Sequence, residues 1–266
     1  MELQPIVKWA GGKRWLIRQS EGLFPDSFDH YYEPFLGGGA VFFHLQPSGA
    51  TLSDTNAELI NVYLSIKHNW KSVVTHLEEH QARHCKEHYY RTRGEIPEDK
   101  AAQAARTLYL NRTCWNGLYR VNLKGEFNVP MGTKTNVLLD VDNFEALAEL
   151  FQNADFYVRD FEVSIDMAGE GDFVFVDPPY TIKHNYNGFI KYNENLFSWD
   201  DQVRLSSAVK GAANRGAKVL VLNANHASIR ELYSDYDQIV LSRSNVLAGK
   251  SEFRGRYEEL AVKAWR

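Results

Sequence analysis

Apolar and polar residues follow two different periods along both ends of the chain. Short apolar or alternating runs, typical of strands, are separated by stretches in which apolar residues recur every three to four positions, as in helices. The pattern predicts strands over residues 30–33, 50–54, 156–158, 173–176, 218–223, 238–241 and 260–264. It predicts helices over residues 40–45, 143–153, 199–214 and 226–234. This alternation predicts an α/β fold, a parallel sheet with helices on both faces, in which the last two strands could pair.

The middle of the chain interrupts this alternation. Residues 56–91 and 100–110 have helical periodicity, and a Gly- and Asn-rich segment over 111–136 follows. Alternation around Leu118–Val121, with a turn at Lys124-Gly125, predicts a β-hairpin in that segment. The predicted organisation is therefore one α/β domain, made of residues 1–55 and 137–266, with residues 56–136 inserted as a helical and hairpin lobe.

The first functional candidate is a glycine-rich turn. In EPFLGGGAVFF, Gly37–Gly39 follow a predicted strand and precede a predicted helix, where glycine lets the backbone approach a ligand closely. Asp54 ends the next strand, and an acidic side chain at that point of an α/β sheet commonly binds ribose hydroxyls. Together they indicate a nucleoside-containing cofactor, with a plain tight turn as the alternative. The spacing fits neither a dinucleotide fingerprint nor a P-loop.

A second candidate ends the strand over 173–176, where FVFV is followed by Asp177-Pro178-Pro179-Tyr180. Neither proline can continue the strand, because neither has an N–H group. An amino group on an aromatic ring is a poor nucleophile. A carboxylate and a backbone carbonyl that accept its two hydrogens would hold it and raise electron density on the nitrogen. Asp177 and the Pro178 carbonyl could do this, with Tyr180 as a stacking ring. The alternative is a proline turn after a core strand, with the acid capping a helix.

Composition narrows the class of protein. The 266 residues are 44% hydrophobic, with a net charge of −4 and a pI of about 6.1, which argues mildly against a pure nucleic-acid binder. Residues 111–134 and 240–257 each carry a local net charge of +3, which suits either phosphate contacts or two solvated loops. Cys85 and Cys114 have no metal or disulfide spacing. No signal peptide or membrane-spanning run is visible, so we expect a soluble cytoplasmic protein.

Five motifs occur in order along the chain: KWAGGK, EPFLGGGA, LSDTN, NGLYRVN…GEFNVP and DPPY. In this order they resemble the Dam-type DNA adenine methyltransferases, including those of GATC restriction–modification systems, over residues 6–265. The resemblance implies a Rossmann-like class I methyltransferase sheet, S-adenosylmethionine as cofactor and no metal. The residues that it implies for cofactor binding are Trp9, Lys13, Phe35, Gly37, Gly38, Gly39, Asp54, Phe161 and Asp177.

The same resemblance implies double-stranded DNA as the partner and adenine as the target base. The adenine would be flipped out of the duplex and stacked on Tyr180, with its 6-amino group held by Asp177 and Pro178. Arg120 would read the first guanine of the site. The residues that we expect at the DNA are Lys8, Arg112, Asn116, Leu118, Arg120 and Pro130.

Two segments depart from the family pattern. Met131-Gly132-Thr133-Lys134 stands where GATC-specific members usually carry a Gly-Arg-Tyr run, and TIKHNYNGFIKYNENLF after DPPY lacks their usual start. The predicted site is therefore GATC or another GA-containing sequence. Transfer to the cytosine amine or to RNA, and a non-catalytic DNA-binding module, are the alternatives. We expect a monomer or weak dimer, with a restriction endonuclease possible in the same system but not in a stable complex.

Overall fold

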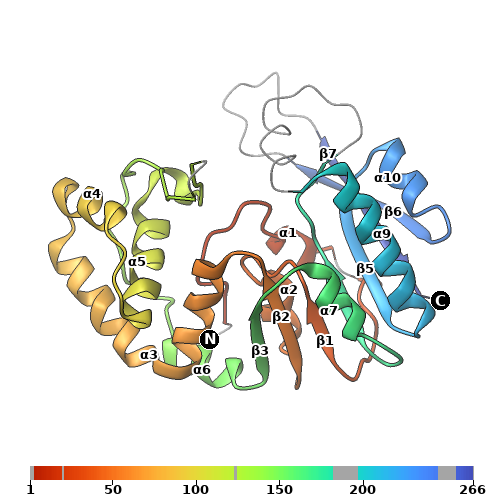
Figure 1. Ribbon diagram of the computed structural model, residues 1–266, viewed down its shortest axis with the longest axis horizontal. Coiled ribbons are helices and arrows are strands. Elements are labelled where there is room, and N and C mark those ends of the chain that lie inside the picture. Colours follow the sequence, from red (N-terminus) through yellow and green to blue (C-terminus); the bar gives the residue numbers. More distant parts are fainter. Residues whose placement is uncertain (1–2, 20, 123–124, 182–196, 245–255, 266) are drawn as a thin grey trace. The chain divides into compact units, whose positions relative to one another are not determined.

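The computed structural model describes residues 3–19, 21–122, 125–181, 197–244 and 256–265 (Figure 1). Contacts within the chain divide it into two compact units. Unit 1 consists of Met1–Arg14 and Leu36–Val158, and unit 2 consists of Trp15–Phe35 and Arg159–Arg266. The predicted organisation, with residues 56–136 as an insertion, concerns a different division of the chain and stays a prediction.

The described helices and strands fall into these units as follows. Unit 1 contains α2 (Ala40–Leu45), β2 (Ala50–Asp54), α3 (Ala57–Arg83), α4 (Lys86–Gly94), α5 (Lys100–Thr113), the 3-10 helix η1 (Trp115–Gly117), α6 (Phe144–Phe151) and β3 (Ala154–Val158). Unit 2 contains β1 (Tyr31–Glu33), α7 (Phe161–Met167), β4 (Phe173–Val176), α9 (Trp199–Asn214), β5 (Lys218–Ala224), α10 (Ala227–Leu232), β6 (Asp237–Ser244) and β7 (Arg256–Ala264). The short helix α1 (Arg14–Ile17) contains the chain boundary between them.

The described strands form a seven-stranded sheet in the order β3-β2-β1-β4-β5-β7-β6. Within unit 1, β2 pairs with β3 in parallel. Within unit 2, β4 pairs in parallel with β1 and with β5, whereas β7 pairs antiparallel with both β5 and β6. The predicted α/β fold with parallel strands is confirmed, and so is the pairing of the last two strands.

Both faces of β4 are buried in the core of unit 2. Val174 and Val176 belong to an apolar cluster that includes residues of α7, α9 and α10, and Figure 1 shows α7 and α9 in front of the strands of this unit. The ring of Phe173 lies among those of Phe24 and Phe28. A strand buried on both faces has a continuous apolar sequence rather than an alternating one. The packing therefore explains FVFV and holds the point where the chain leaves the strand.

Aromatic packing anchors the core of unit 1. Tyr63 of α3 stacks on Phe156 of β3, with ring centroids 5.2 Å apart and planes at 10°, and it packs edge-on against Phe151 of α6. Its hydroxyl donates a hydrogen bond of 2.9 Å to the carbonyl oxygen of Gly37. Helix α3 thus fixes the glycine turn as well as the sheet.

Two local features refine the predicted elements. Residues 56–91 are not one continuous helix. Asn69 has a non-helical backbone (φ −152°, ψ 49°) inside α3, and His84 leaves the helical region (φ −59°, ψ 108°) at the end of α3. The sulfur of Cys85 then accepts a hydrogen bond from His88 N–H to cap α4. The predicted hairpin is confirmed in outline: Val121 and Phe127 form an antiparallel bridge, and Asn128 N–H donates to Arg120 O. Lys124 of its turn lies outside the described residues.

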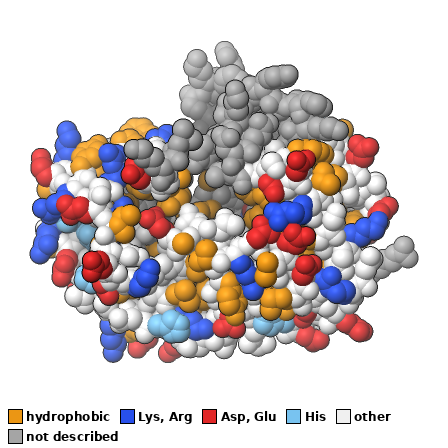
Figure 2. Space-filling model, in the orientation of Figure 1, with side chains coloured by type: hydrophobic (Ala, Val, Ile, Leu, Met, Phe, Trp, Pro, Cys, Tyr) orange, Lys and Arg blue, Asp and Glu red, His pale blue; other side chains and the backbone are white. Residues whose placement is uncertain are grey.

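The structure describes the two positively charged segments to different extents. Nearly all of residues 111–134 are described, whereas most of residues 240–257 lie outside the described residues, as does the segment after Thr181. Figure 2 shows acidic and basic side chains interspersed over the face that it draws. In the described part of the chain, no helix is both long enough and apolar enough to cross a membrane.

Three histidines near the junction of α3 and α4 surround Tyr109 of α5. His80 stacks on Tyr109 with centroids 4.6 Å apart, and His84 Nδ1 lies 3.0 Å from its hydroxyl. His88 Nδ1 accepts a hydrogen bond from Arg91, so His88 Nε2 must carry the hydrogen that it shares with His80 Nδ1 at 2.9 Å. Both imidazoles are neutral in this arrangement. Burial is the main reason that the pKa of His80 falls to about 4, and the neighbouring His88 adds to the effect.

The lowered pKa of His80 predicts that the stability of the protein depends on pH. An unfolded histidine binds its proton near pH 6.5, whereas folded His80 does so only near pH 4, so the unfolded state holds more protons between these values. The free energy of unfolding should therefore fall as the pH drops from 6.5 towards 4. His80→Phe should reduce that slope by up to about 1.4 kcal/mol per pH unit, one proton's worth. Urea unfolding between pH 4.5 and 7.5 measures it. His68→Phe, at an exposed position of the same helix, is the control, and an unchanged slope in His80→Phe would contradict the assignment.

Candidate active site and nucleic-acid interface

The glycine turn of unit 1 is bound directly to the end of β2. Gly37 N–H donates to Asp54 Oδ2 at 3.0 Å, and Asn56 N–H donates to Asp54 Oδ1 at 2.9 Å. Asn56 in turn caps α3 through its side chain, which accepts from Leu59 N–H. Burial raises the pKa of the Asp54 carboxyl, and the hydrogen bonds from the backbone N–H groups oppose that rise. Both carboxylate oxygens are thus held in fixed directions at the carboxyl end of a parallel strand.

Glycine is required in this turn for two reasons. Gly37 and Gly39 have φ of +48° and +65°, in the left-handed region that other residues rarely adopt. A Cβ atom on Gly37 would lie 2.7 Å from Cδ1 of Trp9, closer than carbon atoms can approach. Gly38 is less crowded, with its nearest neighbour at 3.4 Å. The turn therefore brings its backbone and the Trp9 ring together, and both belong to the predicted cofactor site.

The segment Lys8-Trp9 is held on its other side by α5 and the hairpin. The side chain of Asn111 accepts from Lys8 N–H and donates to Lys8 O, each at 2.8 Å. The Trp9 ring stacks on Tyr119, with centroids 4.8 Å apart and planes at 26°. Tyr119 donates from its hydroxyl to Glu58 Oε2 at 3.0 Å. Lys13, by contrast, is buried and donates to Gly11 O at 2.8 Å within its own turn.

The structure brings Lys8 together with the predicted DNA-reading segment. A Cβ atom on Gly117 would lie 2.5 Å from Cδ of Lys8, and Gly117 has φ of +64°. The neighbouring Asn116 also has a left-handed backbone, with φ of 57°. A hydrogen bond with Lys134, burial and the charge of Lys134 lower the pKa of Lys8. Four of the predicted DNA-contacting residues near this point are exposed: Asn116, Leu118, Arg120 and Pro130.

Arg120 itself is an exposed residue on the first arm of the hairpin, next to the bridge between Val121 and Phe127. Its Nε donates to Asn128 Oδ1 at 2.8 Å, which crosses the hairpin and orients the guanidinium. The backbone of the same two residues is joined by Asn128 N–H and Arg120 O at 3.1 Å. This geometry holds the guanidinium at the surface.

Arg112 lies in a different environment from the other predicted DNA contacts. It is 7% exposed, and its guanidinium forms a bidentate ion pair with the Asp142 carboxylate, with N–O distances of 2.6 and 2.8 Å. It also donates to Val137 O at 2.6 Å. These contacts join the end of α5 to the segment that leads into α6. We therefore assign Arg112 to the packing of unit 1 and leave it out of the proposed DNA contacts.

The Asp177-Pro178-Pro179-Tyr180 turn of unit 2 directly follows β4 and is held by side chains from other elements. Tyr180 donates from its hydroxyl to Glu259 Oε2 of β7 at 2.5 Å, and Glu259 is 2% exposed. The Pro179 carbonyl accepts from Gln202 Nε2 of α9 at 3.3 Å. Thr181, the next residue, donates to Phe197 O at 2.6 Å. The turn is thus fixed at three successive positions.

Phe35 and Phe161 meet within unit 2. Their rings stack with centroids 5.3 Å apart and planes at 22°, and each also contacts Phe197. The guanidinium of Arg204 lies 4.3 Å from the centre of the Phe161 ring, and its hydrogen bonds to Asp160 keep it ionised by raising its pKa. Two residues predicted to bind the cofactor therefore share one aromatic cluster.

Comparison with known proteins decides which family this arrangement belongs to. Residues 9–246 match the model of the D12 class N6 adenine-specific DNA methyltransferases. The chain is 37% identical to the type II methyltransferase M1.LlaDCHI of Lactococcus lactis subsp. cremoris, over 98% of this chain and 95% of that protein. It is 32% identical to the type II methyltransferase M.MjaIII of Methanocaldococcus jannaschii, over 98% and 99%. It is 32% identical to the DNA adenine methylase of Escherichia coli K12, over 96% and 93%.

The chain belongs to the D12 class of N6 adenine-specific DNA methyltransferases. The predicted family and class of enzyme are confirmed. The seven-stranded mixed sheet agrees with the Rossmann-like fold expected of such an enzyme.

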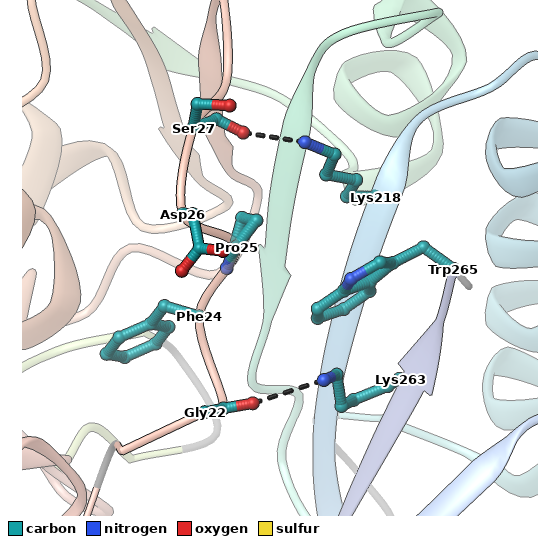
Figure 3. Close-up of a pocket in the computed structure, with 8 residues that line it drawn as sticks. All are labelled: Gly22, Phe24, Pro25, Asp26, Ser27, Lys218, Lys263 and Trp265. Atoms are coloured by element: carbon teal, nitrogen blue, oxygen red, sulfur yellow. Dashed lines mark hydrogen bonds between the residues drawn. The ribbon is translucent and has the colours of Figure 1, made fainter.

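One cavity of this methyltransferase lies away from the DPPY turn. It has a volume of about 350 Å³ in unit 2, and Figure 3 shows its lining residues. Lys218 is paired with Phe173, the first residue of β4, so it lies at the opposite end of the strands from Asp177. Lys218 and Lys263 donate to backbone carbonyls of Ser27 and Gly22 at 2.7 and 3.1 Å. We assign this cavity to packing between the amino-terminal segment of unit 2 and the sheet.

Several residues that hold the glycine turn, the Lys8-Trp9 segment and the DPPY turn could not be found from the motifs. Gln202 and Asn111 lie in helices, where an isolated amide looks like an ordinary surface residue. Glu259 follows Glu258 in RYEELAVKA, where a glutamate beside another charged residue looks like an ordinary surface residue. Asn223 had a visible signal, because it interrupts the apolar run of KVLVLNA in a strand that is buried on both faces.

The ion pair between Arg112 and Asp142 predicts that loss of Arg112 lowers stability but leaves the affinity for DNA unchanged. Arg112→Met should leave the Asp142 carboxylate buried without its partner and lower the free energy of unfolding by about 3–5 kcal/mol. Its affinity for DNA, measured below the unfolding temperature by fluorescence anisotropy, should be unchanged. Arg120→Ala is the matched control and should show the reverse pattern. Weaker DNA binding by Arg112→Met at unchanged stability would restore Arg112 as a DNA contact.

Proposed function

We propose that this methyltransferase transfers a methyl group from S-adenosylmethionine to the 6-amino nitrogen of an adenine flipped out of duplex DNA, in GATC or a related GA-containing site. The observation that carries the proposal is the DPPY turn. A carboxylate, Asp177, and a carbonyl, that of Pro178, follow β4 at its carboxyl end, and the hydroxyl of the neighbouring Tyr180 is fixed by Glu259. These two acceptors would bind the amino group of the target base.

The chemistry of the residues in unit 1 suits the cofactor. The glycine turn packs its backbone directly against the Trp9 ring, with no room for a side chain on Gly37. The Asp54 carboxylate is held rigidly at a strand end, where ribose hydroxyls could donate to it. Trp9, Lys13 and Gly37–Gly39 would complete this half. S-adenosylmethionine would supply an electrophilic methyl group on a sulfonium ion. Phe35 would form part of the wall of the cofactor site, Phe161 would flank the adenine of the cofactor, and Asp177 would border its methionine end.

The DPPY residues would prepare the target nitrogen. The Asp177 carboxylate and the Pro178 carbonyl would each accept one N–H of the amino group, which orients its lone pair and strengthens it as a nucleophile. The Tyr180 ring would stack on the flipped adenine and replace part of the stacking lost from the duplex. After transfer, the nitrogen would lose one proton, which the Asp177 carboxylate would accept. The products would be N6-methyladenine in DNA and S-adenosylhomocysteine.

Residues of unit 1 would read the DNA. Arg120 would bind the first guanine through two hydrogen bonds, because its guanidinium is exposed and oriented by Asn128. Asn116, Leu118 and Pro130 would contact neighbouring positions, and Lys8 would contact DNA beside the site. We propose further that the enzyme is a cytoplasmic monomer or weak dimer that needs no metal. A restriction endonuclease, if its system has one, would form no stable complex with it.

The test of this proposal is to map modified bases in DNA methylated by the purified enzyme. We expect N6-methyladenine in a single GA-containing sequence, formed only with S-adenosylmethionine. Parallel reactions with RNA and with DNA that lacks the site serve as comparisons. Labelled methyl found in cytosine or only in RNA would assign a different substrate, and binding without any transfer would indicate a non-catalytic module.

Loss of the Asp177 carboxylate should abolish methyl transfer. Asp177→Ala removes one of the two acceptors for the amino group, so the rate should fall by at least about 10³-fold, in the range of general-base and electrostatic contributions. DNA binding should persist. Single-turnover transfer of labelled methyl measures the rate, and a gel shift measures DNA binding. Asp140→Ala, at an exposed aspartate of unit 1, is the control. Normal turnover by Asp177→Ala would remove Asp177 from the mechanism.

Arg120→Ala should weaken discrimination at the first base of the site. The loss should be about 1–3 kcal/mol, typical of a bidentate arginine–guanine contact, and should appear as methylation of sites with another base at that position. Competition between cognate and substituted duplexes measures it. Arg83→Ala, at an exposed arginine of α3, should keep the wild-type preference. An unchanged preference in Arg120→Ala would mean that another residue reads the guanine.

Gly37→Ala should impair binding of the cofactor. The added Cβ atom would collide with Trp9, and alanine is strained by roughly 1–2 kcal/mol at a left-handed φ. We expect the Kd for S-adenosylhomocysteine, measured by calorimetry, to rise by roughly tenfold or more. Gly94→Ala has open space around the new Cβ atom and is the matched control. Equal binding by both variants would show that the glycine turn does not contact the cofactor.

A further inference from the structure

We infer that Gln202, held in place by Asn223, is a positioning residue that sets the backbone of the DPPY turn for methyl transfer. The inference rests on the proposed function of Asp177 and Pro178. It adds two buried side chains, from α9 and β5, which no motif of the sequence indicates.

Four groups form a hydrogen-bonded relay that ends at the turn. Ala224 N–H donates to Asn223 Oδ1 at 2.8 Å, and Asn223 Nδ2 donates to Gln202 Oε1 at 2.9 Å. Gln202 Nε2 then donates to Pro179 O at 3.3 Å. Both amide side chains are completely buried, at 0% exposure. A buried amide is stable only when its groups are paired, so the relay is a costly feature to place inside a core.

The chemistry of the groups fixes the direction of the relay. A backbone N–H can only donate, so the atom of Asn223 that faces Ala224 N–H must be the oxygen. Its NH2 group then faces Gln202, whose oxygen must accept, and the NH2 group of Gln202 is left for the Pro179 carbonyl. Neither amide can flip without placing two donors or two acceptors against each other. The turn therefore receives a donor of fixed direction.

Both amides stand on rigid elements. Gln202 lies in the first turn of α9, which a capping box between Ser198 and Asp201 closes, and its own N–H donates to Ser198 O at 3.2 Å. Asn223 lies in β5, which pairs with β4 on one side and β7 on the other. The relay thus ties the end of β4 to two neighbours that cannot shift independently.

The two prolines explain why an outside donor is needed. Pro178 and Pro179 have no N–H groups, so neither can donate a hydrogen bond to hold the turn. Their carbonyls are the only backbone groups that they offer. Gln202 binds the second carbonyl, which sets the peptide plane that follows Pro179 and leaves the Pro178 carbonyl to face the amino group of the target. A shift of about 1 Å at a reacting group can slow a reaction by about 10²-fold.

Gln202→Met is the variant that tests this role. Methionine has a similar volume but cannot donate to Pro179 O or accept from Asn223. The single-turnover rate constant of methyl transfer should fall by about 10–100-fold, whereas the Kd for DNA and for S-adenosylhomocysteine should stay within about threefold. Asn223→Leu, which cuts the relay one step earlier, should give a similar loss. The double variant should be no slower than Gln202→Met, because the two residues act in series.

Leu205→Ala separates positioning from stability. Leu205 is buried in the same helix and has no part in the relay, so its truncation lowers stability without touching the turn. Its transfer rate constant, measured well below its unfolding temperature, should match that of the wild type. The inference is overturned if Gln202→Met transfers methyl at the wild-type rate. It is also overturned if Leu205→Ala loses as much stability as Gln202→Met and its transfer rate constant falls by the same factor. Asn223→Ser, a smaller change, replaces any relay variant that does not fold.

Failure of the proposed function would be seen separately. If the wild-type enzyme forms no N6-methyladenine, the proposed reaction fails before any variant is compared. If the wild type methylates adenine and Gln202→Met does so equally fast, only the role of the relay fails.

Discussion

The two hydrogen bonds accepted by Asp54 determine the arrangement of unit 1. They bind the glycine turn and the start of α3 to the end of β2. Tyr63 of α3 adds a direct hydrogen bond from its hydroxyl to Gly37 O. A carboxylate with one backbone N–H on each oxygen cannot rotate without losing a hydrogen bond. The strand end, the turn and the helix therefore form one rigid corner, and the Trp9 ring fits against it only because Gly37 has no side chain.

The turn at the end of β4 in unit 2 is held in the opposite way, by donors from outside the turn. In unit 1 the turn supplies N–H groups to a side chain, whereas the double proline of unit 2 has none to supply. Side chains from α9 and β7 must therefore reach the turn: Gln202 binds a carbonyl and Glu259 binds the hydroxyl of Tyr180. Buried polar groups in this unit are concentrated where the backbone cannot hold itself.

Features that depend on backbone chemistry could be predicted from the sequence. Glycines after a strand and prolines after FVFV each have a local meaning, and both turns lie at the predicted strand ends. Features that depend on pairing over a long distance could not be predicted in the same way. Arg112 looked like part of a basic surface, because its charge was counted without Asp142, thirty residues further along the chain. Gln202 had no local signal, since its partners come from other elements.

Lys8 and Trp9 have a consequence for how the specificity of such an enzyme can change. Lys8 packs against Gly117, beside the residues within 116–130 that we propose read the DNA, and Trp9 packs against both Tyr119 of the hairpin and Gly37 of the glycine turn. Lys8 and Trp9 thus pack against both the glycine turn and the hairpin segment. A hairpin segment transplanted from a relative would have to pack against a Lys8-Trp9 segment with which it did not evolve. Exchange of recognition segments between such enzymes should therefore succeed best when the amino-terminal segment is moved together with the hairpin, so that the two are inherited as one module.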